Sequence, residues 1–157
     1  MVQLRKKPLM NSRKNLKKHK ELLKDGAGSA FVSAGNSGAL LMGATFINKR
    51  IASIKRPAFA PLIPKYNGYF LLIDSGANVD CRPEILEQFA LMGSIYLKYM
   101  LNIAKPRVGL ANIGIEEHKG GTLQQETYKL LQQNPTINFV GNIEAREIPM
   151  DAADVVV

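Results

Sequence analysis

Two strands and a helix between them are expected in residues 107–140, which read RVGLANIGIEEHKGGTLQQETYKLLQQNPTINFV. Residues 107–113 and 137–140 have the apolar character of buried strands, and residues 122–133 have helical spacing that stops at an Asn-Pro pair. A strand, a helix of ten or more residues and a second strand form a βαβ unit, whose two strands run parallel. This stretch therefore predicts an α/β protein.

The same alternation continues on both sides. Further strands are expected at residues 30–33, 69–73 and 154–157, helices at 37–49 and 83–101, and a proline-rich extended segment at 56–67. The helix at 37–49 is apolar on nearly every side, which is typical of a well-buried helix. We expect a largely parallel sheet with helices on both faces. Because the last strand runs to the end of the chain, we interpret the sequence as a piece of a longer protein.

Length and composition set outer limits on the class of protein. The chain has 157 residues, about one domain, and 46% of them are apolar, so a sizeable core can form. No apolar run approaches the ~20 residues that a membrane-spanning helix needs, and no apolar segment follows the basic N-terminus as in a signal peptide. A single cysteine excludes an intrachain disulfide and argues against a structural zinc site. A cytoplasmic location is the default expectation.

The net charge of +8 is concentrated at the N-terminus. Residues 1–24 contain nine Lys or Arg and one Glu, whereas residues 25–157 contain twelve basic and twelve acidic residues. We therefore divide the chain into a basic N-terminal arm or helix, 1–24, and a partial α/β domain, 25–157. Such an arm attracts nucleic acid, anionic lipid or an acidic protein, unless it is simply a solvated helical face. The arm has no aromatic residue to stack on bases, so nucleic acid is not the expected partner.

Four polar segments follow expected strands, at residues 33–38, 74–80, 112–120 and 141–144. In a parallel sheet all four open on the same edge, where α/β proteins bind their ligands. Gly, Asn and Asp recur in them, which points to one shared polar crevice.

The first segment has the features of an anion site. Gly35 and Gly38 allow a ligand close to the backbone, and the helix that follows presents free N–H groups. The alternative is an ordinary turn capped by Ser or Asn. The segment is not a P-loop, because no Lys-Ser/Thr pair follows at the required spacing, and no dinucleotide fingerprint is present.

Lys119, in the third segment, is the candidate charged group. It can act as a point charge for an anion or as a proton donor with Glu117 as its partner, or it can be a surface lysine. Asp74 and Asp80 either pair with Lys119, orient water or cap the helix at 83–101. Cys81 near that helix start is a conceivable nucleophile, but no histidine lies nearby in the sequence to activate it.

At these segments the sequence resembles the PlsX family of phosphate acyltransferases. The matching stretches are VSAGNSGAL (32–40), DSGANVDC (74–81), QFALMGSIY (88–96), RVGLANIGIEEHKGG (107–121), INFVGNIEAREI (137–148) and ADVVV (153–157). The resemblance covers roughly residues 25–157. Family members have a further strand-loop segment upstream and a second half downstream, so it also implies that this chain is a fragment.

The resemblance implies a Rossmann-like, three-layer α/β/α fold, incomplete at both ends, and a homodimer. It implies that inorganic phosphate attacks the thioester of an acyl-acyl carrier protein, giving acyl phosphate. A membrane acyltransferase then passes the acyl group to glycerol 3-phosphate, so family members work in phospholipid synthesis at the cytoplasmic membrane face. The leaving thiolate needs little help, so no metal or cofactor is expected.

We therefore expect Lys119 and Asn36 to be catalytic, with Asn78 as a further candidate donor to the oxyanion. The residues expected to shape the phosphate pocket are Gly35, Ser37, Gly38, Asp74, Asn78, Asp80 and Asn142. The alternative function is a non-catalytic module that binds nucleic acid or another anion through its basic arm. A nucleotide-binding Rossmann enzyme is a weaker alternative.

Overall fold

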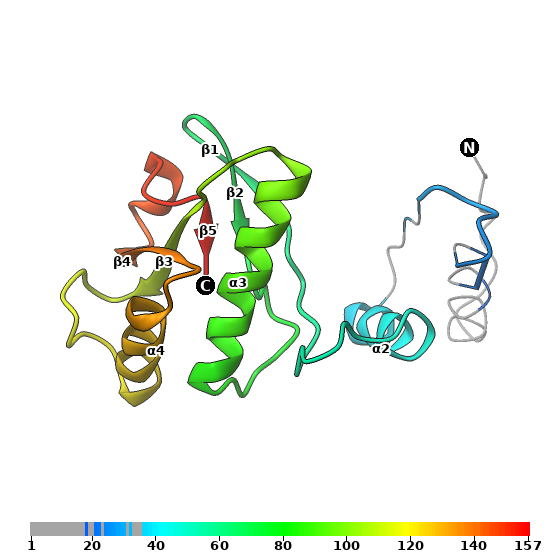
Figure 1. The fold of residues 1–157 in the computed structure, drawn as a ribbon, viewed down its shortest axis with the longest axis horizontal. Coiled ribbons are helices and arrows are strands. Elements are labelled where there is room, and N and C mark those ends of the chain that lie inside the picture. The colour runs from blue at the N-terminus through cyan, green and yellow to red at the C-terminus, as the bar shows by residue number, and fades with distance from the viewer. Residues whose placement is uncertain (1–17, 19–20, 23, 31, 33–35) are drawn as a thin grey trace. The chain divides into compact units, whose positions relative to one another are not determined.

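The computed structural model describes residues 18, 21–22, 24–30, 32 and 36–157. The chain divides into two compact units, residues 1–53 and 54–157, and each is described by itself (Figure 1). The expected boundary after residue 24 stays a prediction, because most of residues 1–24 lie outside the described ones.

The second unit is built on a five-stranded sheet. Its strands are β1 (Leu62–Lys65), β2 (Gly68–Leu72), β3 (Arg107–Asn112), β4 (Asn138–Glu144) and β5 (Val155–Val156), in the spatial order β1-β2-β5-β3-β4. β1 pairs with β2 antiparallel, and all other neighbours are parallel. The carboxyl ends of β2, β5, β3 and β4 therefore meet at one edge of the sheet, called here the carboxyl edge. The predicted α/β fold with a mostly parallel sheet is confirmed.

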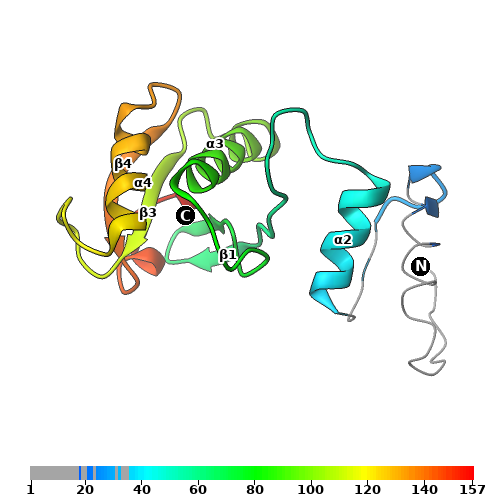
Figure 2. The same ribbon diagram turned by 90° about the horizontal axis from the view of Figure 1, so that it is seen from below.

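Helices α3 (Pro83–Met100) and α4 (Thr122–Gln133) lie beside each other on one face of this sheet (Figures 1 and 2). Their buried side chains, including Phe89 and Leu131, pack against one set of alternating strand residues, including Val108. Gly93 lets α3 approach β5 closely, because a Cβ there would lie 2.6 Å from Val155 Cγ1. The main core lies between these helices and the sheet.

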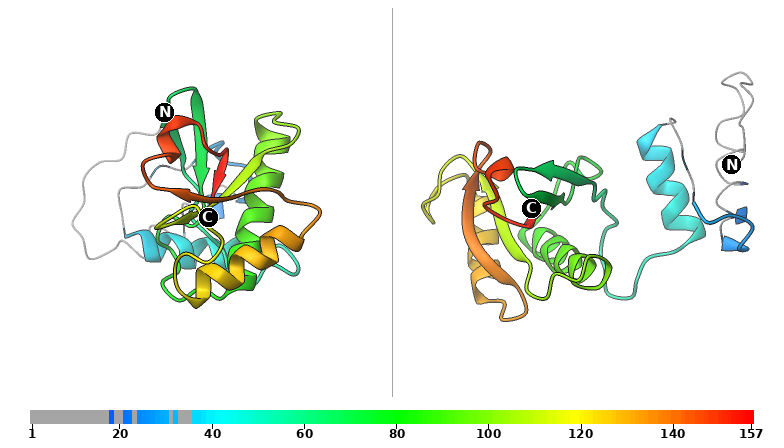
Figure 3. Two further views of the ribbon diagram at one scale, coloured as in Figure 1. Left: turned by 90° about the vertical axis from the view of Figure 1, so that its left-hand side faces the viewer. Right: turned by 90° about the horizontal axis from the view of Figure 1, so that it is seen from above.

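A second, smaller core lies on the other face. Phe70, Ile143 and Val156 are buried there under the segment that contains the short 3₁₀ helix η2 (Ile148–Met150). This segment lies beside the β1–β2 hairpin (Figure 3, right). The Tyr66 N–H in the turn of the hairpin donates to the Pro149 carbonyl at 2.8 Å. No α-helix covers this face among residues 54–157.

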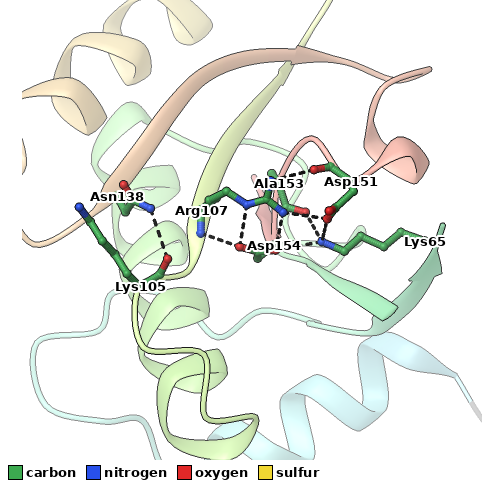
Figure 4. Close-up of polar contacts among 7 residues, drawn as sticks. All are labelled: Lys65, Lys105, Arg107, Asn138, Asp151, Ala153 and Asp154. Atoms are coloured by element: carbon green, nitrogen blue, oxygen red, sulfur yellow. Dashed lines mark hydrogen bonds and ion pairs between the residues drawn. The ribbon is translucent and has the colours of Figure 1, made fainter. Parts of the chain in front are cut away.

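A network of charges ties the opposite edge of the sheet together (Figure 4). Lys65 Nζ, on a side chain only 3% exposed, lies 2.9 Å from Asp154 Oδ1. Arg107 Nε donates to Asp154 Oδ2 at 3.1 Å, and its Nη2 donates to Asp151 Oδ1 at 2.7 Å. The network joins β1, β3 and the residues before β5. Burial raises the pKa of Asp154, but hydrogen bonds from Arg107 and Lys65 outweigh it and hold the pKa well below its usual range.

Two local predictions are corrected. The expected strand at 137–140 continues as β4 to Glu144, so residues 141–144 are strand and not loop. A Gly-Asn pair such as Gly141-Asn142 is typical of a turn. Here the strand continues through it: Val140 has no pairing partner in β3, and pairing resumes at Gly141, whose φ is 99°. The N-cap of α3 is Arg82, without a side-chain hydrogen bond, and not an aspartate or Cys81.

The first unit contains helix α2 (Ser37–Ile47), close to the predicted range. None of its residues is buried, so the expected well-buried helix is not found. Of the expected strand at 30–33, Phe31 and Ser33 lie outside the described residues, and Ala30 and Val32 belong to no strand. No helix in the described part of the chain has the length and apolarity to cross a membrane.

Candidate functional site

Two of the four polar segments expected from the sequence lie as loops at the carboxyl edge. Residues 74–80 follow β2, and residues 113–121 follow β3. β5 lies between these two strands, so the two loops stand about two strand spacings, ~10 Å, apart. The turn at Asn36 belongs to the other compact unit, and its convergence on this edge stays a prediction.

The loop after β2 is held by Asp74 and Asn78. Asp74 Oδ1 accepts from the Phe59 N–H at 2.8 Å, and its Oδ2 accepts from the backbone N–H and the Nδ2 of Asn78 at 2.6 and 3.0 Å. Asn78 Nδ2 also donates to the Pro57 carbonyl at 2.9 Å. Both amide hydrogens of Asn78 are thus engaged within the protein, and Asp74 organises its own loop instead of pairing with Lys119.

Asp80 and Cys81 complete this loop. Asp80 is exposed, and its backbone carbonyl accepts from Arg56 Nη1 at 2.8 Å. Burial raises the pKa of the half-buried Cys81 thiol, and Arg56 offsets this only in part. A raised pKa disfavours the thiolate, so the environment does not activate Cys81 as a nucleophile. In the part of the chain that the structure describes, no three His, Cys, Asp or Glu residues gather as they would around a metal ion.

Lys119 stands on a tight turn after β3. Its N–H donates to the Glu116 carbonyl at 3.1 Å, and that carbonyl also accepts from Asn142 Nδ2 at 2.7 Å. The Lys119 carbonyl accepts from Asn112 Nδ2 at 3.1 Å. The Lys119 side chain is 41% exposed, with Nζ 4.0 Å from Glu116 Oε2. The turn therefore presents an ammonium group to solvent at the carboxyl edge.

The predicted partnership of Lys119 with Glu117 is replaced by one with Glu116. Glu117 Oε1 instead accepts from the Tyr128 hydroxyl at 3.2 Å, on α4. At 4.0 Å the Glu116–Lys119 contact is a loose ion pair between largely exposed groups. Lys119 is thus available to a second anion.

In the first unit, Asn36 is the N-cap of α2. Its Oδ1 accepts from the Ala39 N–H at 2.9 Å, and a Cβ on Gly38 would lie 3.2 Å from this oxygen. This is the capping turn that the sequence left open as an alternative. Ser37, the first residue of the helix, is exposed, and Gly35 lies outside the described residues.

Sequence reasoning missed three residues that shape the Lys119 turn. Asn112 is the last residue of β3, and a Cβ on Gly114 would lie 2.9 Å from Lys119 Cγ. Gly120 adopts φ +79°, and a Cβ there would lie 2.7 Å from Asn112 Oδ1. The available signal was Asn112 itself, an asparagine at the end of a strand with glycines on either side in the sequence. Its partner is the backbone carbonyl of Lys119, and a backbone partner cannot be recognised from residue types.

Together these observations define an α/β protein with polar loops and a solvent-exposed ammonium group at the carboxyl ends of its parallel strands, where proteins of this class bind their ligands. A solved structure with a similar fold is the EutD phosphotransacetylase from Staphylococcus aureus. The TM-score is 0.62 at 17% identity, over 90% of this chain and 50% of that one. At this identity the likeness concerns the fold.

The sequence comparisons are more specific. The profile of a family described as "fatty acid synthesis protein" matches residues 1–157. A phosphate acyltransferase of Clostridium perfringens (strain SM101 / Type A) is 49% identical over 143 residues, and one of Clostridium kluyveri (strain NBRC 12016) is 53% identical over 133. These matches cover 91% and 85% of this chain but only 42% and 40% of the relatives. The chain belongs to this family, the PlsX family, and spans less than half the length of the relatives it matches.

Proposed function

We propose that this chain carries the phosphate-binding edge of an acyltransferase that moves an acyl group from acyl-acyl carrier protein to inorganic phosphate. The single observation that carries the proposal is Lys119, presented at the carboxyl edge of a chain whose relatives are named phosphate acyltransferases. A compact ammonium is suited to a small, doubly charged anion. The product, an acyl phosphate, is a precursor for phospholipid synthesis.

In the proposed reaction, a phosphate oxygen attacks the carbonyl carbon of the thioester. The carbonyl electrons move to oxygen, giving a tetrahedral oxyanion. When the carbonyl re-forms, the carbon–sulfur bond breaks and the thiolate leaves with the carrier. Lys119 attracts the phosphate and stabilises the negative charge of the transition state. No enzyme-bound acyl intermediate is needed, which agrees with the unactivated thiol of Cys81.

The other expected site residues take more limited roles in the proposal. Asp74 and Asn78 hold the loop after β2 in shape, and Asp80 lies exposed beside it. Asn36, Ser37 and Gly38 offer the start of α2 as a second anion-binding element, together with Gly35.

The proposed partners follow from charge and from the family. The basic segment 1–24 suits an acidic carrier protein or an anionic lipid surface. A homodimer, a cytoplasmic location with peripheral membrane association, and delivery of acyl phosphate to a membrane glycerol-3-phosphate acyltransferase complete the proposal.

The test is the formation of acyl phosphate, trapped with hydroxylamine, from acyl-acyl carrier protein and phosphate without ATP. We expect Lys119→Ala to lower turnover by about 10²–10³-fold, the usual loss when one oxyanion donor is removed. Lys129→Ala, which removes an exposed lysine on α4, is the matched control and should leave turnover unchanged. Equal turnover by the parent chain and by Lys119→Ala would refute the catalytic role of Lys119.

A further inference from the structure

Two asparagines bracket the turn that carries Lys119. Asn112 ends β3, and Asn142 lies near the end of the neighbouring β4. Each donates its side-chain amide to a backbone carbonyl at one end of the turn, Asn142 to Glu116 at 2.7 Å and Asn112 to Lys119 at 3.1 Å. The turn is therefore fastened at both ends to adjacent strands of the sheet.

The orientation of each amide is determined by its contacts. Asn112 Oδ1 accepts from the Ile113 N–H at 2.8 Å, so its Nδ2 must face the Lys119 carbonyl. Asn142 Nδ2 faces the Glu116 carbonyl, where the reversed amide would place two oxygens together. Both side chains act as donors to the turn.

Asn142 holds the turn at a cost. The residue is 5% exposed, and its Oδ1 is buried without a hydrogen-bond partner among the described residues. A buried carbonyl without a donor destabilises the folded state. Phosphate accepts hydrogen bonds, and the buried Asn142 Oδ1 can only accept them too. The expected role of Asn142 as a phosphate ligand therefore has no support in its contacts. An aliphatic side chain of the same size would suit the packing better, but it would leave the turn unfastened.

We propose that Asn112 and Asn142 are positioning residues that fix the Glu116–Lys119 turn and thereby the Lys119 ammonium. The importance of Lys119 for phosphate rests on the proposed function, whereas the fastening of the turn does not. Gly114 belongs to the same arrangement, because the Lys119 stem lies across it where any Cβ would collide with Cγ. The fixed turn reduces the motion that Lys119 would otherwise lose when an anion binds.

The experiment compares Asn142→Leu and Asn112→Ala in the whole chain by hydrogen exchange. The Lys119 N–H reports on the turn, because it donates to the carbonyl that Asn142 holds. We expect its exchange to become about five- to tenfold faster in Asn142→Leu, as for the loss of one net hydrogen bond. The free energy of unfolding should stay equal or rise in this variant, because the unpaired carbonyl is removed. Asn112 is half-exposed, so Asn112→Ala should fold even if Asn142→Leu does not. It tests the other end of the turn.

Asn138→Leu is the matched control. Asn138 Nδ2 donates to the Lys105 carbonyl at 3.3 Å, the same kind of contact at the far end of the same two strands (Figure 4). It should leave the exchange of the Lys119 N–H unchanged. Titration with inorganic phosphate, followed by NMR at the amides of residues 113–121, should give weaker binding in both test variants and unchanged binding in the control.

Unchanged exchange of the Lys119 N–H in both test variants would overturn the proposal. So would faster exchange that is fully explained by a lower free energy of unfolding, since the asparagines would then be merely structural. Lys119→Ala separates the two proposals. If it binds phosphate as tightly as the parent chain, the proposed function fails, while faster exchange in the asparagine variants still supports the fastening of the turn.

Discussion

At the scale of single residues, the carboxylate of Glu116 is the group that would compete with the proposed phosphate for Lys119. Its Oε2 lies 4.0 Å from Nζ, and both side chains are largely exposed. A contact of this kind contributes about 0.2–1 kcal/mol. An incoming anion must displace this contact and also meets the negative charge of the carboxylate.

We predict that Glu116→Gln strengthens phosphate binding by about two- to fivefold, since it removes this competing charge without shortening the side chain. The gain should shrink as salt is added, because exposed charges are screened. Isothermal titration with phosphate at two salt concentrations measures both effects. Glu117→Gln is the control, because Glu117 contacts Tyr128 and not Lys119. Weaker binding by Glu116→Gln would mean that the carboxylate assists the anion.

The residue types of the candidate site were predictable, but their roles were not. Asp74, Asn78 and Asn142 look like ligands in the sequence, because carboxylates and amides next to glycine occur in binding loops and in self-bonded loops alike. Their partners are backbone groups of Phe59, Pro57 and Glu116. Those partners depend on how distant segments pack. Lys119 was predictable, because a strand end followed by a charged, glycine-flanked loop places it at the edge of a parallel sheet.

At the scale of elements, Gly93 determines how closely α3 packs on the sheet. A Cβ at this position would meet Val155 Cγ1 at 2.6 Å and Leu71 Cδ2 at 3.3 Å, both in the buried core. Alanine favours a helix by about 1 kcal/mol over glycine, but overpacking a core costs about 1–3 kcal/mol. The second effect should dominate, because Val155 is fully buried and cannot move aside.

We therefore predict that Gly93→Ala lowers the free energy of unfolding by about 1–2 kcal/mol, measured by urea denaturation. The double variant Gly93→Ala/Val155→Ala supplies the control, since it removes the collision. The two substitutions should be less costly together than the sum of their separate effects. Strict additivity would show that Gly93 acts through something other than contact with Val155.

Most elements were predictable because their periodicity is strong. Helical spacing and the Asn-Pro stop placed α4 at its observed bounds, and short apolar runs placed β2 and β3 to within one residue of theirs. The extension of β4 was missed because glycine and asparagine normally signal a turn, whereas here pairing with β3 carries the strand past them. The strand order β1-β2-β5-β3-β4 could not be predicted from the sequence either. The chain returns to insert β5 between β2 and β3, and no local sequence pattern indicates this return.

At the scale of the whole molecule, the carboxyl edge of the sheet and the edge opposite to it carry different kinds of residues. The carboxyl edge carries the loops of the candidate site, and the opposite edge carries the network of Lys65, Arg107, Asp151 and Asp154. This network joins segments up to 89 residues apart in sequence. It fastens the returning segment before β5, so the packing of the central strand depends on it.

Acid should therefore loosen the second unit through Asp154. Its folded pKa lies well below the ordinary value of about 4, so its carboxylate stabilises the fold fully above pH ~4. This stability is lost as the pH falls from ~4 toward the folded pKa, because the unfolded chain then binds the proton more readily. Asp154→Asn should lower the free energy of unfolding at pH 7 by about 2–4 kcal/mol, since Lys65 stays buried with one partner fewer.

The same variant should flatten the acid dependence. Urea denaturation of the parent chain between pH ~6 and ~2.5 should give a free energy of unfolding that falls more steeply below pH ~4 than that of Asp154→Asn. Asp80→Asn, which changes an exposed carboxylate at the other edge, should keep the steep fall of the parent chain. Parallel curves for the parent chain and Asp154→Asn would mean that Asp154 is no better stabilised as a carboxylate in the folded chain than in the unfolded one. The closure of the sheet around β5 would then depend on its backbone pairing with β2 and β3, on the ion pairs of Asp151 and on the apolar packing of Val155 and Val156.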